Sequence, residues 1–153
     1  MALLVYAIID RLENSVVIRN EINRLLENLT ILSEAAALAT SPALADELVS
    51  HGELMSTLLF VEILRNRQVQ AEWFDIRKVI RTDDHFGRAT PDSAVLTELA
   101  QTLLKPRLHA TLVITQGFIG SDAKGRTTTL GRGGSDYTAS LIGAAVNASE
   151  IQI

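Results

Sequence analysis

The sequence predicts an α/β protein with a helix-rich N-terminal part, on three observations. Apolar residues recur every three or four positions through the first third of the chain, which is the period of an amphipathic helix. A short continuous apolar run at 112–114 is typical of a strand in a parallel sheet. A glycine-rich loop at 131–134 follows that strand and precedes a further apolar stretch, as at a strand–loop–helix junction.

Composition limits the class of protein. The chain has 153 residues, of which 47% are apolar and 21% charged, and this suits one globular domain with a hydrophobic core. Its net charge of −4 disfavours a nucleic-acid partner, although residues 101–153 carry five basic against three acidic residues. The absence of cysteine excludes disulfides and thiolate zinc ligands. With no basic leader and no apolar run near the roughly 18 residues of a membrane span, we expect a cytoplasmic protein without a membrane partner.

The first forty residues are predicted to be helical. Their apolar stripe consists of Ile18, Ile22, Leu25, Leu29 and Leu32. A second helix is predicted from Pro42 to about Arg65, because Ser41 is a good N-cap and proline suits the first helical position. Asp46 and Glu47 then lie near the positive end of the helix dipole. The predicted core residues of this helix are Leu44, Leu48, Met55, Leu59 and Ile63.

The middle of the chain is predicted to alternate between short elements. Residues 69–80 are rich in β-branched and aromatic residues, which predicts strand-like segments. Residues 82–91 are polar and contain glycine and a terminal proline, which predicts a loop or short hairpin. A further helix is predicted over 92–104, where Asp92 or Ser93 serves as the cap and Lys105-Pro106 as the stop.

The last third is predicted to contain the sheet. The run at 112–114 predicts a strand buried on both faces, and a helix is expected from Asp136 to about Asn147. Residues 150–153 resemble the start of another strand. Because a parallel strand that stops after a few residues leaves backbone groups unpaired, we expect the chain to be a piece of a longer protein.

The segment 127–136 combines the features of an anion site. Gly131, Gly133 and Gly134 allow positive φ and close approach of a ligand, and a helix that starts near Ser135-Asp136 directs free amides at the loop. Arg132 adds a forked cation that suits a carboxylate, and residues 127–129 supply three threonine hydroxyls. The segment is neither a Walker loop nor a dinucleotide fingerprint. An ordinary glycine turn with Ser135 and Asp136 as helix caps is the alternative.

Two long segments resemble one enzyme family. The segment GFIGSDAKGRTTTLGRGGSDYTA, residues 117–139, resembles the most characteristic stretch of aspartate kinases, particularly the lysine-sensitive type. The segment ALATSPALADELVSHGELMSTLLFVEIL, residues 37–64, resembles the substrate-facing helix of the same family, and nearly all of the chain matches in register. The resemblance implies part of an amino-acid kinase fold, a mainly parallel sheet between helical layers. Its helical substrate-side region is expected at about 1–66 and its sheet and loop region at about 67–153.

The resemblance also implies an activity and a set of site residues. Aspartate kinases phosphorylate the side-chain carboxylate of L-aspartate with ATP and Mg²⁺, giving 4-aspartyl phosphate for lysine, threonine and methionine synthesis, and a homodimer is expected. Arg132 matches the clamp on the α-carboxylate, and Glu53 matches the acid that faces the ammonium group. Ser135 and Asp136 match residues that complete the pocket, with Asp136 also resembling the acid that positions catalytic lysines. The candidates for phosphate contact are Thr129, Gly131, Gly133 and Gly134, and no metal ligands are expected.

Departures from the family are equally informative. The family's N-terminal Lys-Phe-Gly-Gly-Thr-Ser segment, its adenine-facing segment and its C-terminal lysine-sensing domains have no counterpart in this sequence. We therefore expect these residues alone to lack kinase activity and to hold no cofactor tightly. Lys124 and Arg126 are not assigned the role of the missing lysine.

Three alternatives stay open at this point. The chain could belong to another amino-acid kinase that acts on glutamate, acetylglutamate or a nucleotide. Residues 1–66 could form a non-enzymatic helical oligomerisation module. The chain could also hold aspartate without phosphorylating it. Without the family resemblance, Glu53 is interpreted as a solvated acid and His51 as a structural or surface histidine. His85 and His109 lack the spacing of a metal site.

Overall fold

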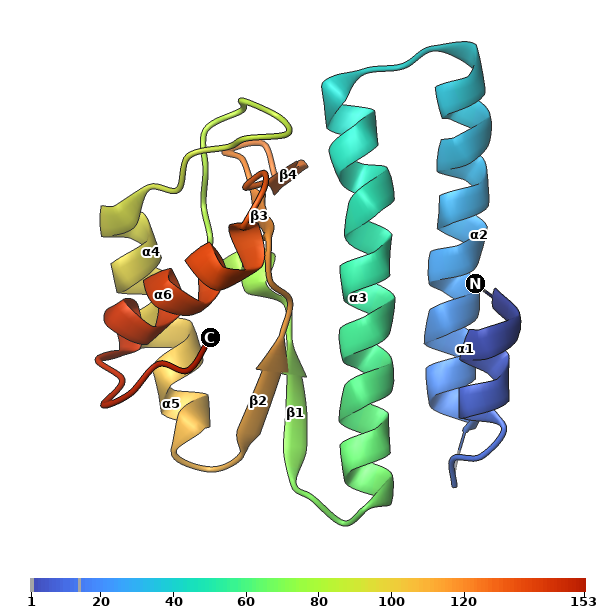
Figure 1. Cartoon of the computed structure of the whole chain (residues 1–153), viewed down its shortest axis with the longest axis horizontal. Coiled ribbons are helices and arrows are strands. Elements are labelled where there is room, and N and C mark those ends of the chain that lie inside the picture. The colour runs from blue at the N-terminus through green and yellow to red at the C-terminus, as the bar shows by residue number, and fades with distance from the viewer. Residues whose placement is uncertain (1, 14) are drawn as a thin grey trace.

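The computed structural model describes residues 2–13 and 15–153 as a helical hairpin packed beside a small sheet, with further helices on the other side (Figure 1). The hairpin consists of α2 (Val16–Leu38) and α3 (Pro42–Asn66), and the short α1 (Ala2–Ile9) packs against α2. The later elements are β1 (Ala71–Phe74), the 3₁₀ turn η1 (Ile76–Lys78), α4 (Ser93–Leu99), the π-helical turn η2 (Ala100–Leu104), α5 (Lys105–Leu108), β2 (Leu112–Thr115), β3 (Ile119–Ser121), β4 (Thr127–Thr129) and α6 (Gly134–Val146).

The helical hairpin confirms most of what the periodicity predicts. Ile18, Ile22 and Leu25 of the predicted stripe are buried, whereas Leu29 and Leu32 are only partly buried. The Ser41 hydroxyl accepts the Leu44 amide at 3.2 Å, which confirms the N-cap of α3. The first forty residues nevertheless form two helices, because α1 ends at Ile9 and α2 begins at Val16. On α3, Met55 and Leu59 are buried as predicted. The predicted Leu44, Leu48 and Ile63 are only partly buried, whereas Leu54 and Val61 are fully buried.

The strands form two pairs. β1 runs parallel to β2 in a register from Ala71 opposite Leu112 to Phe74 opposite Thr115. β3 and β4 form an antiparallel hairpin, and the predicted loop 82–91 is closed by a bridge between its two ends. The strand predicted over 69–80 ends at Phe74, because the Asp75 carboxylate accepts the Arg77 amide and closes a 3₁₀ turn.

Three predictions about the later elements are wrong. The strand at β2 is not buried on both faces: Leu112 is 49% exposed, and β1 is its only paired strand among the residues described. The helix after Asp92 does not stop at Lys105-Pro106, because Pro106 lies in the first turn of α5, where its missing N–H costs no helical bond. Residues 150–153 form no strand, and Ile151 instead lies over Gly143 of α6.

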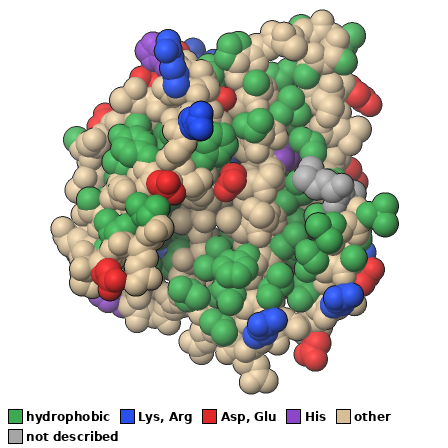
Figure 2. All heavy atoms as spheres, in the orientation of Figure 1, with side chains coloured by type: hydrophobic (Ala, Val, Ile, Leu, Met, Phe, Trp, Pro, Cys, Tyr) green, Lys and Arg blue, Asp and Glu red, His purple; other side chains and the backbone are tan. Residues whose placement is uncertain are grey.

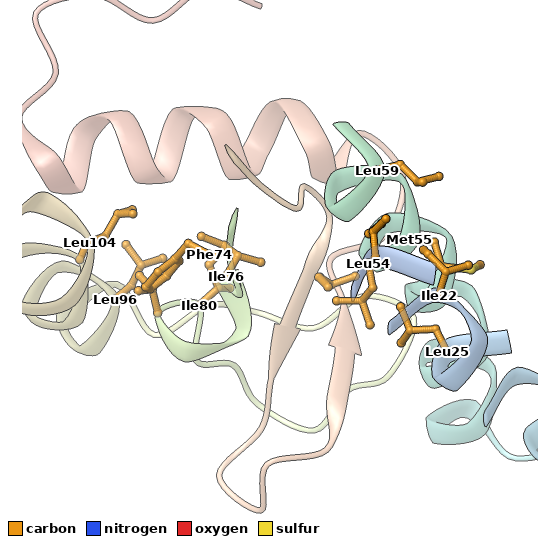
Figure 3. Close-up of a cluster of buried hydrophobic side chains, with 14 of the residues drawn as sticks. Ile22, Leu25, Leu54, Met55, Leu59, Phe74, Ile76, Ile80, Leu96 and Leu104 are labelled. Atoms are coloured by element: carbon orange, nitrogen blue, oxygen red, sulfur yellow. The ribbon is translucent and has the colours of Figure 1, made fainter. Parts of the chain in front are cut away.

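One hydrophobic core joins the helical hairpin to the sheet. Figure 3 shows two groups of side chains within it. The first lies between α2 and α3 and contains Ile22, Leu25, Leu54, Met55 and Leu59, and the second lies beside β1 and contains Phe74, Ile76, Ile80, Leu96 and Leu104. Because α3 packs against α2 and against β1, β2 and β4, it is the element that orients the helices on the strands. Within the described residues, no helix has the length and apolar content needed to cross a membrane.

Candidate substrate site at the start of α6

The buried carboxylate of Asp46 connects α3 to the β3–β4 hairpin, which leads into the glycine-rich loop. Asp46 is only 4% exposed. Its Oδ2 accepts the amides of Gly87 and Thr129, each at 2.8 Å, and its Oδ1 accepts the Thr129 hydroxyl at 2.8 Å. Three hydrogen bonds to one buried side chain form a strong anchor, because breaking them would leave buried donors without a partner. The start of α3 is therefore fixed to β4 and to the 82–91 loop.

A second polar tie connects α3 to the carboxyl ends of β1 and β2. The Thr57 hydroxyl accepts the Trp73 indole N–H and the Gln116 side-chain amide, each at 2.9 Å. The Gln116 side-chain carbonyl in turn accepts the Ile76 amide at 3.0 Å, and Gln116 is 1% exposed. Since Gln116 directly follows β2, this network holds α3 beside the strand ends, the usual location of ligands in α/β sheets.

Glu53 lies between these two ties. It follows Asp46 by seven residues and precedes Thr57 by four, so all three share one face of α3. The helical rise separates Glu53 from Asp46 by about 10 Å and from Thr57 by about 6 Å along the axis. Glu53 is half-buried, and its helix face is the one that meets the strand ends.

The first turn of α6 packs directly on the segment after β2. The Phe118 amide donates to the Thr138 hydroxyl of α6 at 2.9 Å, and the Leu130 amide donates to the Phe118 carbonyl at 2.9 Å. A Cβ at Gly117 would lie 2.9 Å from the Ser135 Cβ, so the backbone and the helix meet without room for a side chain. Figure 1 shows α6 beginning near β3, and the start of α6 is the end of this helix that lies closer to α3 in the view.

Two of the three predicted loop glycines adopt positive φ. Gly131 has φ +78° and Gly133 has φ +75°, which confirms the requirement for glycine at these positions. Gly134 is helical, and its lack of a side chain serves packing instead, since a Cβ there would lie 3.1 Å from Phe118. α6 begins at Gly134, earlier than the predicted Asp136, and Gly133 occupies the N-cap.

The start of α6 presents free hydrogen-bond donors. The Tyr137 amide makes the first helical bond, to the Gly133 carbonyl at 3.1 Å. The amides of Ser135 and Asp136 have no hydrogen-bond partner within the described part of the chain, and both residues are exposed. The exposed Arg132 forms no ion pair with any described residue. These donors lie at the positive end of a 13-residue helix, which suits a carboxylate or phosphate.

The predicted site residues thus lie on two elements. Arg132, Ser135 and Asp136 occupy the loop and first turn of α6, whereas Glu53 lies on α3. Gln116 bonds Thr57 of α3, and the next residue, Gly117, packs against Ser135. Figure 2 shows acidic and basic side chains close together on the face of the molecule that it presents. Cavities of about 520 and 220 Å³ lie elsewhere and are lined by other residues. A hollow shared by Glu53 and Arg132 stays a prediction.

The three threonines expected to supply hydroxyls are buried in β4. Thr127 accepts the Arg77 guanidinium at 3.0 Å, Thr128 bonds with Thr82 at 2.7 Å, and Thr129 donates to Asp46. These hydroxyls connect β4 to η1, to Thr82 and to α3. Thr129 therefore anchors the loop, and a direct role for it in phosphate contact stays a prediction.

Other charged groups near the hairpin are engaged in structural bonds. Burial alone would raise the pKa of Asp122, but bonds from the Arg126 amide and guanidinium and from the Lys124 amide outweigh it and lower the pKa. The Thr90 amide is the main cause that lowers the pKa of Asp83 to about 2. Arg126 pairs with Asp122 at 2.6 Å, whereas Arg132 and Arg88 are both exposed and form no ion pair with any described residue.

Sequence reasoning misses the residues that position the site. The sequence indicates only a helix-dipole role for Asp46, and it indicates no role for Gln116 or Thr57. A usable signal exists, because Asp46 precedes Glu53 by seven residues on one helix face and Gln116 is a polar residue directly after an apolar strand. His51 is 2% exposed and its Nδ1 bonds the Glu47 carbonyl at 2.8 Å, which confirms its structural role.

Gly117→Ala is expected to lower the free energy of unfolding by about 1–3 kcal/mol, because the new Cβ overpacks the Ser135 contact. Urea unfolding followed by circular dichroism measures this change. The matched control is Gly52→Ala, since Gly52 lies exposed in α3 and a Cβ there would meet no atom within 4 Å. That control is expected to gain about 0.5–1 kcal/mol from helix propensity. Equal stability of Gly117→Ala and the unaltered chain would contradict the close packing.

Helices flank a parallel strand pair, free amide donors lie at a glycine-rich loop, and an acid lies on α3. These features define an α/β protein with a candidate site for a small charged molecule. Residues 7–153 match the model of the amino acid kinase family, and this chain belongs to that family. The predicted amino-acid kinase fold is thereby confirmed.

Several relatives carry the name aspartokinase. The chain is 72% identical over 148 residues to lysine-sensitive aspartokinase 3 of Escherichia coli, covering 97% of this chain and 33% of that protein. It is 41% identical over 108 residues to the aspartokinase of Chlamydia muridarum, covering 70% of this chain and 24% of the relative. The predicted resemblance to lysine-sensitive aspartate kinases is confirmed, and the chain spans about a third or less of these relatives.

Solved structures agree with this family. The crystal structure of E. coli aspartokinase III in complex with aspartate and ADP superposes with a TM-score of 0.93 at 72% identity, covering 95% of this chain and 33% of that one. The aspartate kinase of Clostridium acetobutylicum superposes with a TM-score of 0.60 at 27% identity, covering 81% of this chain and 25% of that one.

Proposed function

We propose that this chain supplies the aspartate-binding part of an aspartate kinase, an enzyme that transfers the ATP γ-phosphate to the side-chain carboxylate of L-aspartate. The observation that carries the proposal is the E. coli relative, 72% identical and solved with aspartate and ADP. The free donors at the start of α6 and the acid on α3 support it independently, because they match the opposite charges of an α-amino acid.

Each charged group of aspartate has a proposed partner. The Arg132 guanidinium holds the α-carboxylate through two parallel hydrogen bonds, and the Glu53 carboxylate faces the ammonium group. The amides of Ser135 and Asp136 stabilise negative charge at the start of α6. Asp136 would act in catalysis by orienting cationic groups that contact the phosphates. Because phosphoryl transfer depends mainly on positioning and charge neutralisation, no side-chain nucleophile is needed.

ATP and Mg²⁺ are proposed to bind together, as one complex. Gly133 leaves the loop backbone open to a phosphate oxygen, because a Cβ there would meet no atom within 4 Å, and the free amides of Ser135 and Asp136 next to it are suitable donors. Residues 2–13 and 15–153 contain no group of three or more acids or histidines that could hold a metal, so Mg²⁺ would be bound largely through ATP. We also propose that the whole protein is a homodimer in the cytoplasm and that these 153 residues alone lack turnover.

A chimera tests the function directly. In E. coli lysine-sensitive aspartokinase 3, this chain replaces the matching 148-residue segment, and aspartyl phosphate formation from ATP and aspartate is measured. The chimera is expected to be active and to prefer aspartate over glutamate by about 10- to 200-fold in kcat/KM, the range for one added methylene. A folded chimera that forms no aspartyl phosphate, or that prefers glutamate, would refute the proposal.

The helical-module alternative has less support. α3 is tied to β4 through Asp46 and to the strand ends through Thr57, and its apolar face belongs to the same core as the sheet. A separate module over 1–66 would leave these buried groups without partners. Light scattering of the chain with and without residues 1–40 distinguishes the two possibilities.

Glu53→Gln in the chimera is expected to raise the KM for aspartate by about 10- to 150-fold, because it removes the counter-charge of the ammonium group. This range corresponds to about 1.5–3 kcal/mol for a hydrogen bond to a charged group. Steady-state kinetics at varied aspartate measures it. Glu62→Gln is the matched control, since Glu62 lies on the same helix and pairs with Arg65. An unchanged KM in Glu53→Gln would remove Glu53 from the site.

A further inference from the structure

We propose that Asp46 is a positioning residue that sets the separation between Glu53 and Arg132. The inference rests on the function proposed above, since it concerns the two groups assigned to aspartate. Asp46 contacts neither group, and it would act through the backbone elements that carry them.

The carboxylate of Asp46 holds the base of the arginine-bearing loop from two sides. It accepts the amide and the hydroxyl of Thr129, which precedes Arg132 by three residues. It also accepts the Gly87 amide, and the Gly87 carbonyl lies 3.0 Å from where a Cβ of Gly131 would stand. One side chain therefore fixes both β4 and the neighbouring loop that supports the turn at Gly131.

The same carboxylate is rigidly connected to Glu53. The two residues are seven positions apart on α3, a helix without a break from Pro42 to Asn66. Two helical turns fix their separation at about 10 Å along the axis. A shift of the loop relative to Asp46 would thus change the span across which Glu53 and Arg132 must hold one small zwitterion.

Geometry rather than charge gives Asp46 this role. Its three partners are neutral donors, and no ion pair to Asp46 occurs within the described ranges. An asparagine of the same shape can still accept the two amides through its carbonyl. Its NH₂ group can donate to the Thr129 hydroxyl, which accepts as well as donates. Alanine makes none of these bonds.

The test uses the active chimera described above. Asp46→Ala is expected to raise the KM for aspartate about 10-fold or more, and by a larger factor than the KM for ATP. Asp46→Asn is expected to keep the KM for aspartate within about 3-fold of normal. The matched control is Asp122→Ala, because Asp122 is also a buried carboxylate that accepts two amides, those of Lys124 and Arg126. Asp122 lies at the β3–β4 turn, so its loss should lower Tm without changing the ratio of the two KM values.

Each outcome decides the question. If Asp46→Ala lowers Tm as Asp122→Ala does and leaves the KM ratio unchanged, Asp46 is a purely structural residue and the inference is wrong. If Asp46→Asn is as impaired as Asp46→Ala, charge and not shape matters, and the inference is also wrong. An unmodified chimera without turnover refutes the proposed function itself, and the inference with it.

A milder pair of variants covers the case in which Asp46→Ala does not fold. Thr129→Val removes one of the three bonds and keeps the backbone amide, whereas Thr129→Ser retains the hydroxyl. The KM for aspartate is expected to rise about 3- to 10-fold in the valine variant and to stay near normal in the serine variant. Equal KM values in the two variants would overturn the inference.

Discussion

Replacing Arg132 by alanine in the chimera is expected to lower kcat/KM for aspartate by about 10²- to 10⁴-fold. The α-carboxylate would lose two charge-assisted hydrogen bonds, each worth about 1.5–3 kcal/mol. Arg132→Lys is expected to stay at least about 10-fold impaired, because a point charge does not reproduce the planar fork. Initial rates at varied aspartate and saturating ATP measure both variants.

The control for Arg132 is Arg126, which precedes it by six residues. Arg126 is also partly exposed, but it pairs with Asp122 at 2.6 Å and stacks over the Phe86 ring at 4.7 Å. Arg126→Ala is therefore expected to keep the KM for aspartate within about 3-fold of normal. Similar losses in both variants would indicate a general effect of positive charge on this surface and would contradict a specific clamp.

Replacing Asp46 by alanine is expected to lower the free energy of unfolding of the chain by about 2–5 kcal/mol. The change leaves the buried amide and hydroxyl of Thr129 without a partner, and each unsatisfied buried donor costs about 1–3 kcal/mol. Since small domains are stable by only about 5–15 kcal/mol, the loss is a large fraction of the total. Urea unfolding of the isolated chain measures it.

Asp92 provides the comparison for this loss. Its carboxylate also accepts two amides, those of Ala94 and Val95, but at the exposed N-terminus of α4. Asp92→Ala is expected to cost about 1 kcal/mol, the usual value of a helix cap, because water reaches the freed amides. If Asp46→Ala lowered the free energy of unfolding no more than Asp92→Ala, the buried bonds of Asp46 would not be a main support of the β3–β4 hairpin.

Local sequence signals are sufficient to predict the helices α2 and α3 and the glycine-rich loop. The apolar period of α2 and the Ser41-Pro42 start of α3 predict these elements closely, because both depend on residues near in sequence. Gly131 and Gly133 are likewise predictable, since only glycine adopts positive φ without strain. The predicted site residues Arg132, Ser135 and Asp136 lie at one turn because they are neighbours in the chain.

Long-range contacts cannot be predicted in the same way. The bonds of Asp46 reach residues 41 and 83 positions away, and no periodic pattern indicates such a pair. The continuation of the helix past Leu104 depends on a π-helical turn, whose register no propensity scale predicts. The exposure of β2 depends on which strands pair with it, and its apolar sequence alone indicates a fully buried strand.

A crystal structure of the chimera with bound aspartate tests the central claim most directly. We predict that the α-carboxylate of aspartate lies within hydrogen-bond distance of the Arg132 guanidinium and that its ammonium group lies within hydrogen-bond distance of the Glu53 carboxylate. Aspartate bound without either contact, or Glu53 and Arg132 on opposite faces with no ligand between them, would contradict the account.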